Sequence, residues 1–150
     1  MRRGTEPGAR RGAAPRVDAW LLAAVTGALY VLYAVLQWRR LEVPSWDLGI
    51  FTQLAERYAH LQPPIVPIKG EGFNLLGDHF HPALVVLGPL YRLFPSGLTL
   101  LVLQAVLLAL SVVPLTRVAQ VVLGRGWGLA LGTAYALSWG LQGAVAAQFH

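Results

Sequence analysis

Residues 20–38 read WLLAAVTGALYVLYAVLQW and carry no charged side chain. A helix rises about 1.5 Å per residue, so roughly 20 apolar residues cross the roughly 30 Å hydrocarbon core of a bilayer. Tryptophans at both ends match the aromatic belts of the two membrane surfaces. The stretch therefore predicts a transmembrane helix over about 19–38. Because the run is longer than the apolar core of a signal peptide, we expect the helix to be retained.

Two further uncharged stretches, residues 97–116 and 127–149, predict a second and a third transmembrane helix. Gln104 is strongly polar, so we expect it to hydrogen-bond to a neighbouring helix. Small residues recur four apart in the last stretch and predict a close helix contact: Gly132, Ala136, Gly140 and Ala144. The fold class is therefore an all-α integral membrane protein.

The composition agrees with this class. The 150-residue chain is 55% hydrophobic and 13% charged, whereas a soluble domain carries about 25% charged residues. Five arginines precede the first apolar run, so the net charge of +5 is interpreted as a topology signal and not as a nucleic-acid site. We expect residues 1–17 to be a disordered basic cytoplasmic tail and residues 18–150 a membrane domain. The chain has no cysteine, which excludes disulfides and thiol nucleophiles.

Residues 39–96 form the predicted extracytoplasmic loop of this domain. Ser45 is placed to cap a helix in the membrane interface. Its apolar positions at helical spacing are Leu48, Phe51, Ala55 and Tyr58, joined less strictly by Leu54 and Leu61. Prolines from Pro63 onward end that helix. Residues 83–94 are apolar but too short to span comfortably, so we expect a juxtamembrane or re-entrant helix started by Pro82. Whether this segment crosses the membrane stays open at this stage.

Asp47 is the candidate catalytic residue. An outer-loop carboxylate just beyond a span can act as a general base toward a hydroxyl, or hold a divalent cation beside a phosphate. The alternative is that Asp47 only complements the dipole of the helix that it begins.

Asp78, His79 and His81 are the candidate substrate-binding residues. In an extended segment His79 and His81 share a face and could reach one metal ion, but a third ligand at fixed spacing is missing from the motif. Asp78 could instead cap the following helix, so no metal ligand set is assigned. Several aromatic residues could line a groove or anchor the loop at the interface: Trp46, Phe51, Tyr58, Phe73 and Phe80. Lys69 and Arg92 could pair with phosphate or remain solvated surface charges.

The order of these motifs resembles a known family. The chain is similar to the bacterial membrane-protein family called domain of unknown function 2079. The similarity lies in a first helix followed by Ser45-Trp46-Asp47-Leu48-Gly49-Ile50-Phe51, Gly77-Asp78-His79-Phe80-His81-Pro82 and then Gln104-Ala105. That family is grouped with the GT-C glycosyltransferases, which take sugars from polyprenyl-phosphate donors. The resemblance implies the N-terminal part of a GT-C-like bundle, with Asp47 as the catalytic or metal-binding aspartate.

The leading hypothesis is therefore a GT-C membrane glycosyltransferase, or an N-terminal fragment of one, in the plasma membrane. Its partners would be the lipid bilayer and a lipid-linked sugar, and its only candidate cofactor a divalent metal ion, Mg or Mn. The alternative is a non-catalytic polytopic membrane protein, a transporter or scaffold subunit, and a third hypothesis is a metal sensor built on His79 and His81. The abrupt end of the chain in an apolar run predicts a longer protein. The sequence leaves the sugar, the acceptor and the oligomeric state open.

Overall fold

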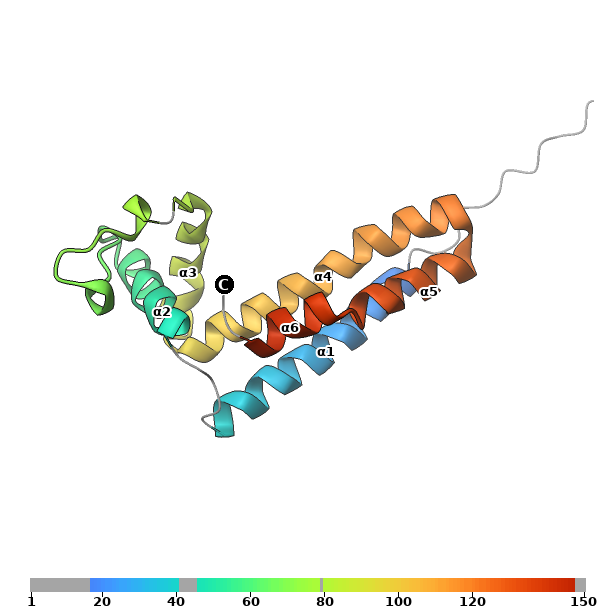
Figure 1. Ribbon diagram of the computed structural model, residues 1–150, viewed down its shortest axis with the longest axis horizontal. Helices are drawn as coiled ribbons and strands as arrows, with labels where there is room; N and C mark the ends of the chain where they lie inside the picture. The colour runs from blue at the N-terminus through green and yellow to red at the C-terminus, as the bar shows by residue number, and fades with distance from the viewer. Residues whose placement is uncertain (1–16, 41–45, 79, 148–150) are drawn as a thin grey trace, which may run out of the picture.

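The computed structural model describes residues 17–40, 46–78 and 80–147, and these residues are almost entirely helical (Figure 1). Within them, extended pairing is limited to one isolated bridge between Ile65 and Asn74. The elements in chain order are α1 Val17–Arg40, α2 Trp46–Ala59, three 3-10 turns (η1 Pro67–Lys69, η2 Leu75–Gly77, η3 Pro82–Val86), α3 Leu87–Leu93, α4 Gly97–Leu123, α5 Arg125–Ala136 and α6 Trp139–Ala147. Helices α1, α4, α5 and α6 form an elongated bundle. Residues 46–96 form a compact unit at one end of it, called the loop unit below.

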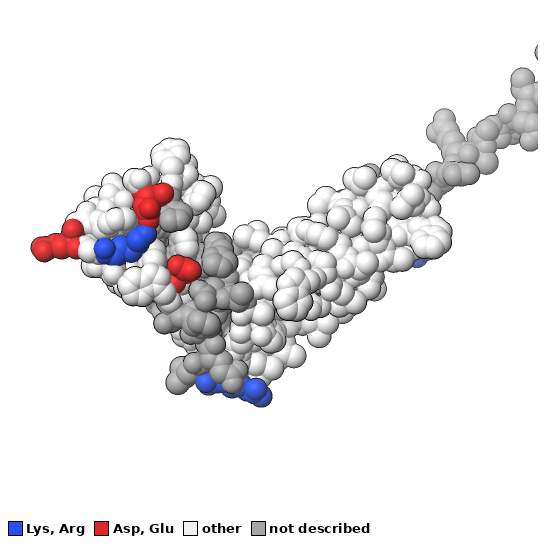
Figure 2. Space-filling model, viewed as in Figure 1, with Lys and Arg blue, Asp and Glu red and all other residues white. Residues whose placement is uncertain are grey.

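Helices α1 and α4 run antiparallel, and each is long and apolar enough to cross a bilayer. Ala34 near the end of α1 shares a core cluster with Leu100 at the start of α4. Ala19 at the start of α1 packs with Val113, later in α4. Figure 2 shows the charged side chains gathered over the loop unit and at the ends of the bundle, with an uncharged surface between them. The two corresponding spans expected from the sequence are confirmed as apolar helices of membrane-crossing length.

Helix α4 continues beyond the predicted end at residue 116 and stops at Leu123, followed by Gly124 with φ 88°. Pro114 lies inside the helix without ending it, since a proline removes only one backbone donor and membrane helices tolerate this loss. The guanidinium of Arg117 lies over the ring of Trp20 at 5.4 Å, which accommodates the charge within the helix. The predicted connection after residue 116 is therefore mostly helical.

In place of the single helix expected over 127–149, the structure has α5 and α6, separated by a turn at Leu137 and Ser138. Side chains satisfy the carbonyl groups that this break exposes. The hydroxyl of Tyr30 donates to the carbonyl of Ala136 at 2.5 Å, and the amide of Gln142 donates to that of Leu137 at 3.2 Å. The interruption is therefore compensated by side-chain hydrogen bonds.

Glutamines from two helices hold α6 beside the bundle. Gln104 Nε2 donates to the carbonyl of Ala144 at 2.9 Å, which confirms the expected interhelical hydrogen bond. Gln37 Nε2 donates to the carbonyl of Ala146 at 3.1 Å. Since Gln37 lies in the last turns of α1, the end of α6 lies at the same end of the bundle as the loop unit. Residues 1–16 and 148–150 lie outside the described residues, so the predicted tail is not among the observed elements, while Val17 already belongs to α1.

Helices α4 and α5 approach closely through glycine. A Cβ atom on Gly132 would clash with the hydroxyl of Thr116, and one on Gly128 would lie 2.5 Å from the backbone nitrogen of Gln120. Ala136 is buried as well. The close contact predicted from Gly132 and Ala136 is thus present, but it extends to Gly128, and Gly140 has no neighbour within 4 Å of its Cβ position.

The loop unit contains its own core. Ile50, Leu54, Val66 and Leu75 form a buried cluster between α2 and the segment that follows it, called the second core below. The opposite side of α2 packs through Leu48 and Ala55 against the bundle end. Leu48, Leu54 and Ala55, which the sequence places at apolar positions of this helix, are buried. Leu61 is 91% exposed, because the chain turns there with a φ of 54°. Ser45 lies outside the described residues.

The segment after His81 begins as predicted. Pro82 starts η3, which leads directly into α3. Together η3 and α3, Pro82–Leu93, form a short apolar helix that packs against α2 and the start of α4. At about 1.5 Å per residue it reaches well short of the roughly 30 Å of a bilayer. Ser96 then caps α4 by accepting a hydrogen bond from the Leu98 amide at 3.2 Å.

Candidate functional site

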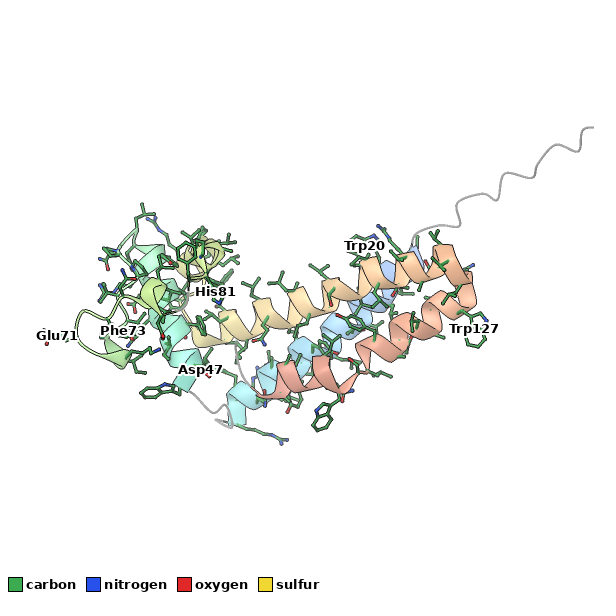
Figure 3. The ribbon with its side chains drawn as sticks, turned by 45° about the horizontal axis from the view of Figure 1, so that its top comes forward. Trp20, Asp47, Glu71, Phe73, His81 and Trp127 are labelled. Carbon is green, nitrogen blue, oxygen red and sulfur yellow. The ribbon has the colours of Figure 1, made fainter. Side chains whose placement is uncertain are left out.

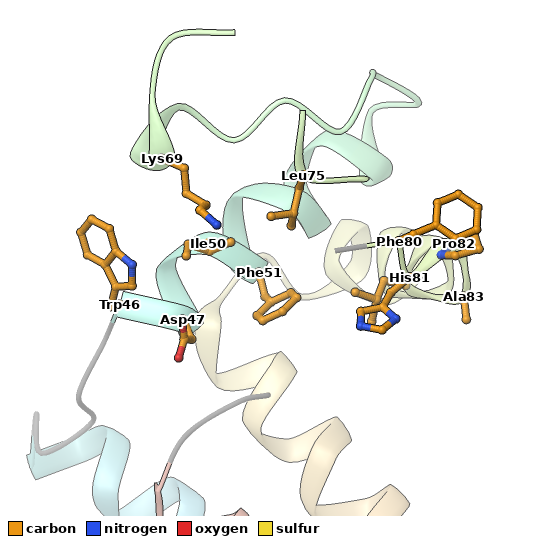
Figure 4. A pocket seen from close by; sticks show the side chains of 11 residues that line it. Trp46, Asp47, Ile50, Phe51, Lys69, Leu75, Phe80, His81, Pro82 and Ala83 are labelled. Carbon is orange, nitrogen blue, oxygen red and sulfur yellow. The ribbon is translucent and has the colours of Figure 1, made fainter. Parts of the chain in front are cut away.

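A cavity of about 710 Å³ opens in the loop unit, called the loop pocket below (Figure 4). Its volume lies within the range of about 300–1,000 Å³ that small-molecule sites occupy. Its walls come from the first turns of α2, from η1 and η2, and from η3. The lining residues are Trp46, Asp47, Ile50, Phe51, Lys69, Leu75, Phe80, His81, Pro82, Ala83 and Leu84. Two of the residues singled out in the sequence, Asp47 and His81, are therefore brought to one cavity.

Asp47 reaches the loop pocket because α2 begins one residue before it. Its carboxylate is half-buried and points away from Lys69, toward the bundle (Figure 4). The same position in the first turn also lets the carboxylate complement the helix dipole. The geometry is thus compatible with both interpretations of Asp47, a reacting group and a helix-stabilising one.

Lys69, which the sequence offered as a phosphate partner or a solvated surface charge, lines the loop pocket. It forms an ion pair with Asp78, and its ammonium lies 4.9 Å from the centre of the Phe73 ring. Asp78 itself is not in the lining, so it acts on the cavity by holding Lys69 at the wall. The chain turns back toward Asp78 after Lys69. Two glycines with positive φ make this turn, Gly70 at 141° and Gly72 at 70°.

The remaining candidates divide between pocket and core. His81 precedes η3 and lines the cavity, whereas His79 lies outside the described residues. Among the aromatic residues, Trp46, Phe51 and Phe80 line the cavity. Two others pack on the second core instead, namely Tyr58 and Phe73. Arg92 is exposed on α3 and is not in the lining.

The described lining of the cavity offers few metal ligands. Within the part of the chain that the structure describes, no three His, Cys, Asp or Glu side chains come together. The described lining supplies one carboxylate and one imidazole, Asp47 and His81, while Asp78 is engaged with Lys69. A bound Mg²⁺ takes about six oxygen ligands, several of them water.

The loop pocket lies where the apolar bundle ends. Helix α2 follows α1 after five residues, and α4 begins directly after the segment that carries His81 and α3. Trp46 is 62% exposed and Phe80 76% exposed, so the cavity has aromatic side chains at its edge as well as the charged groups of Asp47 and Lys69. Such a lining suits an amphipathic ligand with a polar, anionic head.

Comparisons with known proteins agree with the membrane character of the chain. A family model described as "Predicted membrane protein (DUF2079)" matches residues 37–150, which include the whole loop unit and helices α4 to α6. No curated protein and no solved structure matches the chain.

Proposed function

Since the chain belongs to the DUF2079 family of predicted membrane proteins, we propose that it is a membrane glycosyltransferase of GT-C type that uses a polyprenyl-phosphate-linked sugar. One observation carries the proposal: a cavity holding Asp47, Lys69 and His81 lies at the end of the apolar helices. A lipid-linked sugar keeps its tail in the bilayer and presents its phosphate and sugar at the surface. The loop pocket lies at that level if α1 and α4 span the membrane.

The topology proposed with this function is multi-pass, in the plasma membrane. Helices α1 and α4 are the first two crossings, and α5 with α6, which run parallel to α1, are the third. The N-terminus is cytoplasmic and residues 39–96 are extracytoplasmic. The excess of arginine before α1 supports this orientation.

In the proposed reaction Asp47 is the general base. It removes the proton of an acceptor hydroxyl, whose oxygen attacks the anomeric carbon of the sugar while the bond from that carbon to the phosphate oxygen breaks. The leaving group is the polyprenyl phosphate, which departs with the bonding electrons. Lys69, which lines the cavity, and His81 stabilise its developing negative charge. The products are the glycosylated acceptor and polyprenyl phosphate, and the proton is released from Asp47.

The test is Asp47→Asn in the full-length protein, reconstituted in nanodiscs with a panel of polyprenyl-phosphate sugars. Release of polyprenyl phosphate should fall by about 10²–10⁴-fold, the contribution of a positioned general base. Glu71→Gln is the matched control, because Glu71 is an exposed carboxylate at the far tip of the loop unit (Figure 3) and outside the lining. Wild-type turnover in the Asp47→Asn protein would refute the proposed role.

The same assay separates this function from a non-catalytic one. A scaffold or transport subunit would bind polyprenyl phosphate in the loop pocket without turning over any donor of the panel. Transport has less support from the described bundle, because charged groups lie at its ends and not along its middle (Figure 2). Retained ligand binding with no product from the wild-type protein would replace the enzyme by this alternative.

A further inference from the structure

The bundle end opposite the loop pocket contains an arginine whose hydrogen-bonding capacity is incompletely used. Among the described residues, two buried side-chain polar atoms have no hydrogen-bond partner, Thr116 Oγ1 and Arg117 Nε. Thr116 is fully buried under Gly132 of α5. Arg117 is half-buried, and its guanidinium carries five N–H donors and no acceptor. A donor buried without a partner costs about 1–3 kcal/mol, and more when it is charged.

The acidic group nearest in the fold is already occupied. Asp18 in the first turn of α1 pairs with Arg125 at the start of α5, with Arg125 Nε 2.5 Å from the carboxylate oxygen. The described contact of the Arg117 side chain is the ring of Trp20, at 5.4 Å. A cation over an aromatic face is stabilised, but the ring accepts none of its in-plane N–H groups. This end of the bundle therefore has one cation in excess among the described charges of Asp18, Arg117 and Arg125.

The surroundings of Arg117 have the character of a membrane surface. Trp20 is 49% exposed and Trp127 74% exposed, and Figure 3 shows both at the bundle end far from Asp47 and His81. Exposed tryptophans at the end of an apolar helix mark the depth of the lipid headgroups. Exposed apolar side chains adjoin the pair along the same helices, Val17 and Leu21 on α1 and Val118 and Val121 on α4.

We propose that Arg117, stacked on Trp20, binds the phosphate of an anionic phospholipid at this end of the bundle. The phosphate oxygens accept from the remaining N–H groups of the half-buried guanidinium and neutralise the excess cation. The exposed apolar side chains beside the pair take up the acyl chains, which a free phosphate ion does not possess. Phosphatidylcholine is net-neutral, because its choline cancels the charge of its own phosphate, and so it does not neutralise the excess cation. A phosphatidylglycerol-type headgroup is therefore the expected ligand.

The proposal is tested by lipid retention, independently of any transferase activity. The full-length protein is purified in detergent and incubated with phosphatidylglycerol, with phosphatidylcholine, or with phosphatidylglycerol plus inorganic phosphate, and the bound lipid is counted by native mass spectrometry. Arg117→Gln should lower retained phosphatidylglycerol about tenfold, the factor for 1.4 kcal/mol. Arg92→Gln, which removes an exposed arginine of α3 in the loop unit, at the opposite end of the bundle, should stay within about twofold of wild type.

A second variant distinguishes loss of lipid binding from loss of folding. Arg117→Lys keeps the charge but loses the planar fork of donors, so it should retain an intermediate amount of phosphatidylglycerol. Equal retention by wild type, Arg117→Gln and Arg117→Lys overturns the proposal. So does equal retention of phosphatidylcholine, which removes the charge selectivity. Displacement of the lipid by an equal concentration of inorganic phosphate also overturns it, because the site would then recognise a free anion.

Discussion

Replacing Gly128 by alanine should force α5 away from α4. A Cβ atom there would lie 2.5 Å from the backbone nitrogen of Gln120 and 2.6 Å from its Cα, whereas ordinary contacts of a Cβ begin near 3.4 Å. Because both are backbone atoms, no rotation of a side chain relieves the overlap. The two helices must separate locally by about 1 Å.

The size of the effect follows from this displacement. A gap of about 0.5–1 Å forfeits roughly a quarter to a half of each van der Waals contact, and overpacking a tight contact costs about 1–3 kcal/mol. We take about 3 kcal/mol, the upper end of the overpacking cost, because backbone atoms must move. Alanine in place of glycine returns about 1 kcal/mol through helix propensity, which leaves a net loss of about 2 kcal/mol.

The assay is unfolding of the protein in mixed micelles by increasing SDS, followed by circular dichroism. Gly143→Ala is the matched control, because Gly143 lies within α6 and its Cβ position has no neighbour within 4 Å. This control should be neutral or up to about 1 kcal/mol more stable than wild type. If the Gly128→Ala protein is as stable as the Gly143→Ala protein, the close approach of α4 and α5 does not contribute about 2 kcal/mol to the free energy of unfolding.

Two further predictions concern the loop unit. Gln53 Oε1 accepts a hydrogen bond from the Ile68 amide at 3.0 Å, so Gln53→Leu should cost about 1 kcal/mol and speed hydrogen exchange at Ile68; an unchanged exchange rate there would contradict the contact. Burial, reinforced by Glu56, raises the pKa of Tyr91 above its usual 10.0. The folded state therefore resists ionisation, and this contribution to stability is full below about pH 10 and lost as the pH rises through the folded-state pKa. Tyr91→Phe should make the decline in thermal stability above about pH 10 less steep, and an identical decline in both proteins would exclude this cause.

Much of the fold follows from uninterrupted apolar runs. Residues 19–38 predict α1, and Pro95-Ser96-Gly97 places the start of α4 correctly because Ser96 caps it. The break between α5 and α6 has no such local signal. It depends on Tyr30 of α1, a residue more than a hundred positions away, donating to a carbonyl that a continuous helix would use internally. The contact of Gly128 with Gln120 likewise depends on the packing of α5 against α4, which has no local signal in the sequence.

The candidate site was predictable in part. Asp47 and His81 were singled out by residue type and by their places before helices, and both line the loop pocket. The roles proposed for them stay predictions. Lys69 was offered only as a phosphate partner or a solvated charge, and its place in the pocket wall could not be predicted, because it depends on the turn through Gly70 and Gly72 and on its pairing with Asp78. Asp78 pairs with Lys69, and its expected contact with substrate stays a prediction.

The second core has a consequence for binding at the loop pocket. Ile50 and Leu75 belong at once to that core and to the cavity wall, and Phe51 and Leu84 pack on the same cluster. The walls are therefore preorganised when the loop unit folds. Ordering backbone costs roughly 1–2 kcal/mol per residue, and a ligand that meets an ordered wall does not bear this cost. Its affinity then depends on the contacts themselves, so substitutions beneath the cavity, at Leu54 or Val66, should weaken binding without touching the ligand.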